Sequence, residues 1–173
     1  MNEQVILVDE KDKEIGLMPK LEAHQKGVLH RAFSVFIINS QGEMLLQQRA
    51  LGKYHSEGLW SNSCCSHPFP GENTADAAQR RLMEEMGINT TLNFLFSFIY
   101  KAKLGNGLFE HEYDHVYFGV YDKEPVINTS EVAAWKYISM QELQKDIEQH
   151  PSLYTEWFKL SLGEVIKKIA LHT

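Results

Sequence analysis

The sequence contains only two cysteines, Cys64 and Cys65, and they are adjacent. A disulfide between neighbouring residues would close a strained ring, and thiols stay reduced in the cytoplasm, so a disulfide-stabilised fold is not expected. A single pair also excludes the thiolate-rich spacings of structural zinc sites. The simplest interpretation of each cysteine is a small buried apolar residue, and we adopt it for Cys64.

No window of the sequence reaches 18 apolar residues, so no transmembrane helix is expected. The N-terminal segment has no basic region followed by an apolar run, which argues against a signal peptide. We therefore predict a cytoplasmic protein with no membrane partner. The net charge of −6 makes nucleic acid an unsuitable partner, and an anionic ligand would need a local basic pocket.

The residues that are present suit one globular domain spanning positions 1–173. Hydrophobic residues make up 43% of the chain, which is enough to fill a sizeable core. Apolar runs bounded by turn residues predict strands at 4–9, 31–39, 43–49, 90–100, 109–121 and 134–138. Because these strands do not alternate regularly with helices, we expect an α+β fold built around a mixed sheet.

Three helices are predicted. The clearest lies between Asn73, a suitable N-cap, and Gly87, a suitable C-terminal residue, and has an apolar stripe at steps of four. A capping box precedes a helix over 140–149, and a proline suits the first turn of a last helix over 151–170. Residues 19–30 are expected to form a polar connection with a helical turn.

Two carboxylates share one face of the predicted strand 109–121, because Glu110 and Glu112 are two residues apart. Like charges on one face repel each other unless a cation lies between them. Without other evidence, the simpler interpretation is a solvated strand face.

Three histidines, His24, His30 and His67, occur in polar segments that are predicted to be loops or strand edges. Together with two carboxylates they would suit an octahedral site for Mn²⁺, Mg²⁺ or Zn²⁺. Sequence spacing alone does not bring such residues together. Three other histidines are interpreted more simply as surface residues: His55, His150 and His172.

The helix that follows Asn73 carries two pairs at i,i+4 spacing, Arg80 with Glu84 and Arg81 with Glu85. They can be read as surface ion pairs. The functional alternative is an arginine that binds phosphate and a glutamate that binds a divalent ion.

Three further cations, Lys20, Arg49 and Lys53, lie at the ends of predicted elements. Each alone would be an ordinary surface cation. Together with Arg81 they could hold a diphosphate whose oxygens are bridged by Mg²⁺.

The segment from Ser66 to Ile88 resembles the Nudix box, in which a glycine, a glutamate and an Arg-Glu-containing helix follow at fixed spacing. Matching residues here are Glu72, Arg80, Leu82, Glu84, Glu85 and Gly87. Ser66 replaces the first glycine, and Arg81 replaces the glutamate after the first arginine. That glutamate is one of the acidic residues around the metals of Nudix hydrolases, so its loss argues against pyrophosphate hydrolysis.

A closer resemblance is to the type 1 isopentenyl-diphosphate isomerases, a branch of the Nudix superfamily. Their motifs occur in the same order over most of this chain: His24 and His30, Trp60 and Asn62, Cys65-Ser66-His67-Pro68, Arg80-Arg81, and Glu110 and Glu112. Each motif alone is common, but the ordered set is specific. The resemblance implies a Nudix-like mixed β-sheet sandwiched by helices. It also implies interconversion of isopentenyl and dimethylallyl diphosphate, a step of isoprenoid biosynthesis.

The resemblance further implies a role for individual residues. Cys65 and Glu112 would exchange protons with the substrate, Tyr100 would orient the transfer, and Trp157 would face the carbocation. The implied ligands of Mn²⁺ or Zn²⁺ are His24, His30, His67, Glu110 and Glu112. Glu85 would hold Mg²⁺ together with the diphosphate, and the cations that bind the diphosphate would be Lys20, Arg49, Lys53 and Arg81.

The expected partner is therefore a small diphosphate, and the chain is expected to be a monomer or a homodimer. Two alternatives differ in kind from the isomerase. One is a Nudix pyrophosphohydrolase acting on a nucleoside diphosphate compound, which would leave Cys65 and Glu112 without a role. The other is an inactive module that binds metal or diphosphate.

Overall fold

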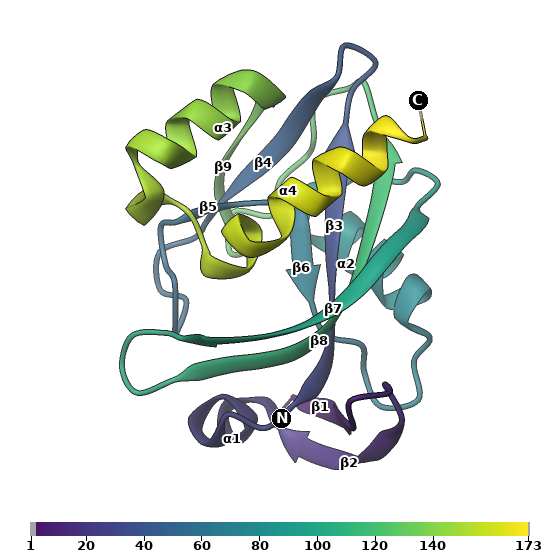
Figure 1. Cartoon of the computed structure of the whole chain (residues 1–173), viewed down its shortest axis with the longest axis vertical. Coiled ribbons are helices and arrows are strands. Elements are labelled where there is room, and N and C mark those ends of the chain that lie inside the picture. Colours follow the sequence, from purple (N-terminus) through teal and green to yellow (C-terminus); the bar gives the residue numbers. More distant parts are fainter. Residues whose placement is uncertain (1–2, 173) are drawn as a thin grey trace.

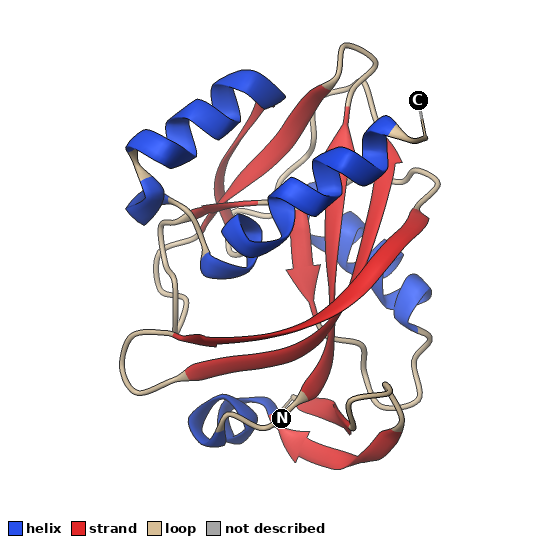
Figure 2. Ribbon diagram, in the orientation of Figure 1, coloured by secondary structure: helices blue, strands red, loops and turns tan. Residues whose placement is uncertain are grey.

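The protein is described by a computed structural model that covers residues 3–172. Within them a single nine-stranded mixed sheet forms the centre of the fold (Figures 1 and 2). Its strands are β1 (Gln4–Val8), β2 (Glu14–Pro19), β3 (His30–Ile38), β4 (Glu43–Arg49), β5 (Trp60–Ser61), β6 (Cys64–Ser66), β7 (Asn93–Lys103), β8 (Phe109–Val120) and β9 (Val132–Ser139). The helices are α1 (Lys20–Lys26), α2 (Thr74–Met86), α3 (Met140–Gln149) and α4 (Glu156–Ala170), with a short 3₁₀ turn η1 (Pro151–Leu153).

Strand β3 is buried on both faces, and its side chains alternate between two hydrophobic cores. Phe33, Val35 and Ile37 pack in one core with the apolar stripe of α2. Phe36 and Ile38 pack in the other core with α3 and α4. This alternation follows from the two-residue period of a strand, and it places helices on both faces of the sheet (Figure 1). The predicted α+β fold with a mixed sheet between helices is confirmed.

The pairing of β3 determines which distant segments meet. β3 lies parallel to β8, and His30 is directly opposite Glu112. On its other side β3 pairs antiparallel with β6, which places Ser34 opposite Cys65. β8 in turn pairs antiparallel with β7, with Tyr100 opposite Glu112. His30 and Glu112, which are 82 positions apart in the sequence, therefore become neighbours across strands.

The predicted ends of α2 are confirmed. The Asn73 side chain accepts hydrogen bonds from the backbone N–H groups of Ala75 and Asp76. Gly87 ends the helix with φ +65°, in the left-handed region that favours glycine. A Cβ at Gly87 would lie 2.7 Å from the carbonyl oxygen of Val126, so this close approach also requires glycine.

The last helix begins later than the sequence predicted. Residues 151–153 form the η1 turn, and α4 starts only at Glu156. Between them Tyr154 bridges to Trp60, and the backbone N–H of Thr155 donates to the carbonyl of Trp60. These tertiary contacts interrupt the helix and fix the position of its first turn. Among residues 3–172, no helix is both long and apolar enough to cross a membrane.

Candidate active site and metal centre

A pocket lies where the N-terminal end of β3, the strands β6 and β8 and the first turn of α4 come together. Most of the residues predicted for catalysis and substrate binding line it, together with Tyr54, His55 and Ser66. The predicted residues among its lining are Lys20, Arg49, Lys53, Cys65, His67, Arg81, Glu85, Glu110, Glu112 and Trp157. His24, His30 and Tyr100 are buried directly behind them.

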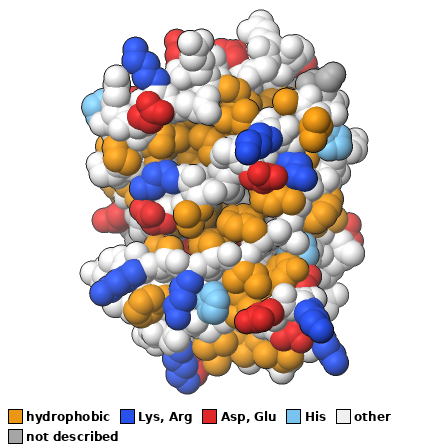
Figure 3. Space-filling model, viewed as in Figure 1, with side chains coloured by type: hydrophobic (Ala, Val, Ile, Leu, Met, Phe, Trp, Pro, Cys, Tyr) orange, Lys and Arg blue, Asp and Glu red, His pale blue; other side chains and the backbone are white. Residues whose placement is uncertain are grey.

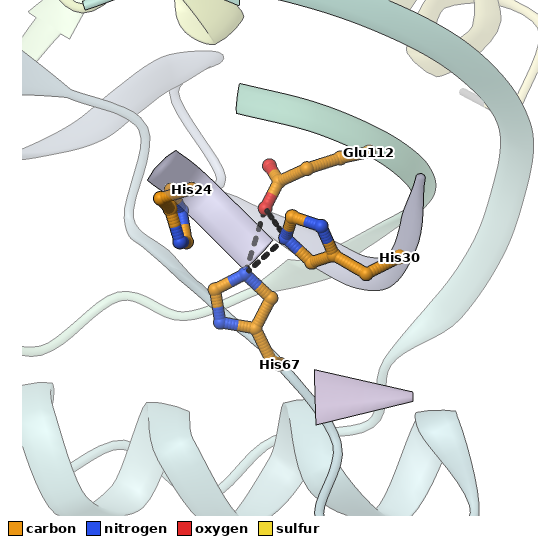
Figure 4. Close-up of side chains that lie close together, drawn as sticks. All are labelled: His24, His30, His67 and Glu112. Atoms are coloured by element: carbon orange, nitrogen blue, oxygen red, sulfur yellow. Dashed lines mark hydrogen bonds and ion pairs between the residues drawn. The ribbon is translucent and has the colours of Figure 1, made fainter. Parts of the chain in front are cut away.

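Three histidines and Glu112 converge on one point in the pocket wall (Figure 4). The Nε2 atoms of His30 and His67 are 3.2 Å apart. Glu112 Oε2 lies 3.2 Å from His30 Nε2 and 2.7 Å from His67 Nε2. His24 completes the group, with its ring centroid 5.2 Å from that of His30. All four residues are buried, unlike the solvated strand face that was the simpler interpretation of the glutamates.

The hydrogen bonds around two of these rings leave their Nε2 lone pairs free. His24 Nδ1 is 2.7 Å from the carbonyl of Lys20, and His30 Nδ1 is 2.9 Å from the carbonyl of Val28. A carbonyl can only accept, so both Nδ1 atoms carry the proton and both Nε2 atoms are unprotonated in the neutral rings. Metal-ligating histidines are typically oriented by such bonds.

The cluster fits a divalent ion. His24 Nε2 is buried and has no hydrogen-bond partner in the protein. Ligands at adjacent vertices of an octahedron with bonds of about 2.1–2.2 Å lie about 3.1 Å apart, close to the 3.2 Å spacings around His30. Imidazole and carboxylate donors together suit Mn²⁺ and Zn²⁺. The buried cluster is therefore compatible with a divalent cation.

A second group of possible ligands contains His24, Glu110 and His55. His55 Nε2 lies 3.5 Å from Glu110 Oε1, and His24 Nε2 lies 3.8 Å from the same oxygen. His55 is only 8% exposed, so its interpretation as a surface histidine is wrong. The segment around His55 is short and polar. Its ring is buried because His24 of α1 and Trp157 of α4 pack against it. His150 and His172 are exposed, as expected.

Burial and neighbouring charges shift the pKa values of the histidines and glutamates in this cluster. Burial lowers the pKa of His67 to about 4. Burial also lowers the pKa of His55 to about 3, and the nearby Arg49 acts in the same direction. Burial and the charge of Glu112 raise the pKa of Glu110. Burial would raise the pKa of Glu112 too, but its interactions with the facing rings of His30 and His67 hold it well below its usual value.

Tyr100 lies on β7 beside both carboxylates. Its hydroxyl is 2.5 Å from Glu110 Oε2, and it also donates to Glu112 Oε1. A phenol has one proton, so at any moment it donates to only one of the two. Burial raises the pKa of Tyr100 well above its usual value, which keeps this proton in place.

The pleat of β6 separates the two cysteines. Cys64 is completely buried in the core with α2. Cys65 points to the opposite face, where it packs against the core that includes Trp157 and lines the pocket. Glu110 and Glu112 are on this same face of the sheet, with β3 between them and Cys65. Burial raises the pKa of Cys65, so its thiol stays protonated near neutral pH.

Four cations line the pocket: Lys20, Arg49, Lys53 and Arg81. Arg49 lies 5.4 Å from the ring centre of Trp157, and Lys53 is ion-paired with Glu131. Lys20 lies 5.4 Å from the ring centre of Tyr54. On the face shown in Figure 3, basic side chains are mixed with acidic ones. Four cations therefore gather at one pocket of a chain with a net charge of −6, and they share its lining with Glu85, Glu110 and Glu112.

The two predicted i,i+4 pairs of α2 differ in their surroundings. Glu84 is 44% exposed, and its bond with Arg80 is an ordinary surface pair. Arg81 and Glu85 are largely buried, with Arg81 Nη2 2.5 Å from Glu85 Oε1. The other oxygen of Glu85 accepts a bond of 3.0 Å from Gln47. The simple interpretation as surface pairs therefore fails for Arg81 and Glu85, which both face the pocket.

Trp157 lies in the first turn of α4 and is 3% exposed. Its Nε1 atom is buried without a hydrogen-bond partner in the protein. The ring lines the pocket and contacts the ring of His55 edge to face at 6.0 Å between centroids. An aromatic face is therefore available beside the thiol and the carboxylates.

Comparison with known proteins defines the class. Residues 28–158 match the model of the NUDIX domain. The fold also matches a crystal structure of DR0079 from Deinococcus radiodurans, with a TM-score of 0.71 over 85% of this chain and 90% of that one, at 19% identity. A MutT NUDIX hydrolase from Burkholderia pseudomallei matches with a TM-score of 0.62, covering 79% of this chain and 98% of the other, at 20% identity. These two structures establish the fold alone.

Curated relatives are more specific. An "Isopentenyl-diphosphate Delta-isomerase 2" of Aromatoleum aromaticum is 52% identical over 96% of this chain and 88% of its own length. An "Isopentenyl-diphosphate Delta-isomerase" of Pectobacterium atrosepticum is 53% identical over 94% of this chain and 90% of its own. The chain therefore belongs to the isopentenyl-diphosphate Delta-isomerase family, within the Nudix proteins.

Proposed function

We propose that the protein isomerises isopentenyl diphosphate to dimethylallyl diphosphate, and that Cys65 and Glu112 exchange the two protons. The observation that carries this proposal is the placement of both groups on one face of the sheet. Cys65 on β6 and Glu112 on β8 flank β3 and line the same pocket. A five-carbon chain lying across β3 would have a proton carrier on each side.

The reaction moves a double bond through a tertiary carbocation, so the pocket must deliver one proton, remove another and exclude water. Each proton carrier contributes on the order of 10²–10⁴-fold to such a reaction. Trp157 offers its ring face to the cation, which is worth about 2 kcal/mol in a desolvated site. The first turn of α4, which carries the buried Trp157, would keep water away from the carbocation, which water would otherwise convert to an alcohol.

The bound ion would be Mn²⁺ or Zn²⁺, held by His24, His30, His67, Glu110 and Glu112. It would polarise the carboxyl group of Glu112, which gives or takes a proton while the thiol of Cys65 does the opposite. Tyr100 orients the same carboxyl through its hydroxyl.

The diphosphate would bind among the cations of the pocket, together with Mg²⁺ held by Glu85. A diphosphate carries up to about three negative charges, which matches a site bordered by several cations. The residues proposed to bind it are Lys20, Arg49, Lys53 and Arg81. Since Arg81 already contacts Glu85, both would lie beside the same phosphate oxygens.

The test is incubation with isopentenyl diphosphate, Mg²⁺ and Mn²⁺ in D₂O, followed by NMR. The wild-type protein should form dimethylallyl diphosphate and incorporate deuterium. Cys65→Ala should lower the rate by at least about 10²-fold, since it removes one proton carrier. Cys64→Ala is the matched control, because this neighbour faces the α2 core, and its rate should stay within about twofold of wild type. Near-normal turnover of Cys65→Ala would rule out its role, and phosphate release without an allylic product would indicate a hydrolase.

A further inference from the structure

We propose that His55 is a sixth protein ligand of the ion bound at the histidine and glutamate centre. The inference rests on the metal centre of the proposed function and adds one residue to it. Resemblance to the isomerases implied five ligands, which leave one vertex of an octahedron open. His55 is the additional buried imidazole whose nitrogen lies against this group.

The distances place His55 beside two of the proposed ligands, His24 and Glu110. Its Nε2 is 3.5 Å from Glu110 Oε1, and His24 Nε2 is 3.8 Å from that oxygen. The ligand atoms of His24, His55 and Glu110 all lie within 4.8 Å of one another, as do those of the group formed by His24 with His30, His67 and Glu112. Opposite vertices of an octahedron are about 4.3 Å apart, so each group by itself has the dimensions of a coordination sphere, and one bound ion would draw the two groups together. His24 belongs to both and joins them.

The ring of His55 is also oriented for this role. Its Nδ1 lies 3.2 Å from Ser56 Oγ, which can accept the Nδ1 proton and leave Nε2 as the free donor atom. The ring stacks on His24 at 5.5 Å between centroids. Arg49 holds the backbone through a bond of 3.2 Å to the His55 carbonyl.

The backbone next to His55 is unusual. Ser56 has φ +52°, in the left-handed region that non-glycine residues rarely adopt. Such a conformation costs about 1 kcal/mol or more, and it is found mostly at functional sites, where the surrounding structure holds a side chain in a required orientation. Here the turn directs the preceding imidazole inward instead of toward solvent.

Six protein ligands would have a consequence for the chemistry. A closed shell leaves no vertex for the diphosphate, so the substrate phosphates would bind at the separate position of Glu85 and the cations. The histidine centre would then act on the substrate only through the carboxyl group of Glu112.

X-ray absorption spectroscopy of the Zn²⁺-loaded protein tests the proposal directly, because the imidazole scattering counts the bound histidines. Wild type should give four imidazoles, and His55→Phe should give three, with the ring packing retained. Its affinity for Zn²⁺, measured by competition with a chelator, should fall by at least about tenfold. His55→Gln provides a smaller replacement in case phenylalanine does not fit, and the same drop to three imidazoles is expected.

Two controls separate this proposal from the proposed centre itself. His24→Ala should strongly weaken Zn²⁺ binding if the centre exists at all, and His150→Phe alters an exposed histidine and should change nothing. Three imidazoles in wild type, unchanged in His55→Phe, would overturn the role of His55 while leaving the centre intact. Unchanged Zn²⁺ affinity in His24→Ala would instead overturn the centre, and the sixth ligand with it.

Discussion

Tyr100→Phe removes one hydroxyl from the wall of the pocket and nothing else. That hydroxyl lies 2.5 Å from Glu110 and also donates to Glu112. With the ring in place, the packing of the core against β7 is preserved. What is lost is the group that holds the Oε1 atom of Glu112 and thereby directs Oε2 toward His30 and His67.

The magnitude follows from the type of bond. A hydrogen bond to a charged group is worth about 1.5–3 kcal/mol, and each 1.4 kcal/mol corresponds to about tenfold in rate. If the bond mainly orients Glu112, we expect kcat to fall by roughly 10–100-fold, with a smaller change in KM because the proposed diphosphate site lies elsewhere. The conversion of isopentenyl diphosphate followed by NMR gives both constants. Metal content measured on the same samples shows whether the ion is retained.

Tyr154→Phe is the matched control. Its hydroxyl also donates to a carboxylate, that of the part-buried Asp146, but this pair connects the residue after η1 with α3 outside the pocket. It should lower the free energy of unfolding and leave kcat unchanged. A Tyr100→Phe protein with full metal content and a kcat within twofold of wild type would refute the reasoning.

Two further variants test the charge and the backbone of the neighbouring elements. Glu131 pairs with Lys53 and lies 3.6 Å from Arg81, so it competes with the diphosphate for both cations. In Glu131→Gln, steady-state kinetics should show KM lowered about twofold to fivefold at unchanged kcat. This change corresponds to a binding free energy of at most about 1 kcal/mol, as expected for a part-exposed charge. A raised KM would contradict the prediction. Gly87→Ala places a Cβ at a φ of +65° and only 2.7 Å from a carbonyl oxygen. Denaturant unfolding should show that it lowers the free energy of unfolding by more than about 2 kcal/mol. Gly71→Ala, at φ +77° with open space around its Cβ, should lower the free energy of unfolding only by the cost of the positive φ. Equal losses of stability in both variants would show that the contact with the Val126 carbonyl at Gly87 adds no cost.

Much of the fold was predictable because local signals agree with the tertiary structure. The cap at Asn73 and the end at Gly87 delimit α2, and the turn after β3 predicts the hairpin with β4. The short strands β5 and β6 had no such signal. They contain only two and three residues, and pairing with β4 and β3 alone makes them strands. The late start of α4 has the same cause, because it depends on contacts with Trp60.

For the site, sequence motifs indicated the residues but not their geometry. His30 meets Glu112 through the parallel pairing of β3 with β8, and no local pattern specifies which strands pair. His55 was missed for a related reason. Its sequence neighbours are polar, and its burial comes from His24 and Trp157, which approach from α1 and α4.

The elements that hold the centre differ in how easily they can detach from the fold. His30, Glu112 and Cys65 belong to β3 and the strands on either side of it, which have strand neighbours and a core on both faces. Such segments are released only when the whole domain unfolds. His24 lies on a seven-residue helix and His55 on a connecting loop, which open at a lower free energy. We therefore expect the proposed metal to enter and leave through local opening of these two segments, while Glu112 and Cys65 stay in place. Hydrogen exchange should accordingly respond to metal in α1 and in residues 50–59, and very little in β3.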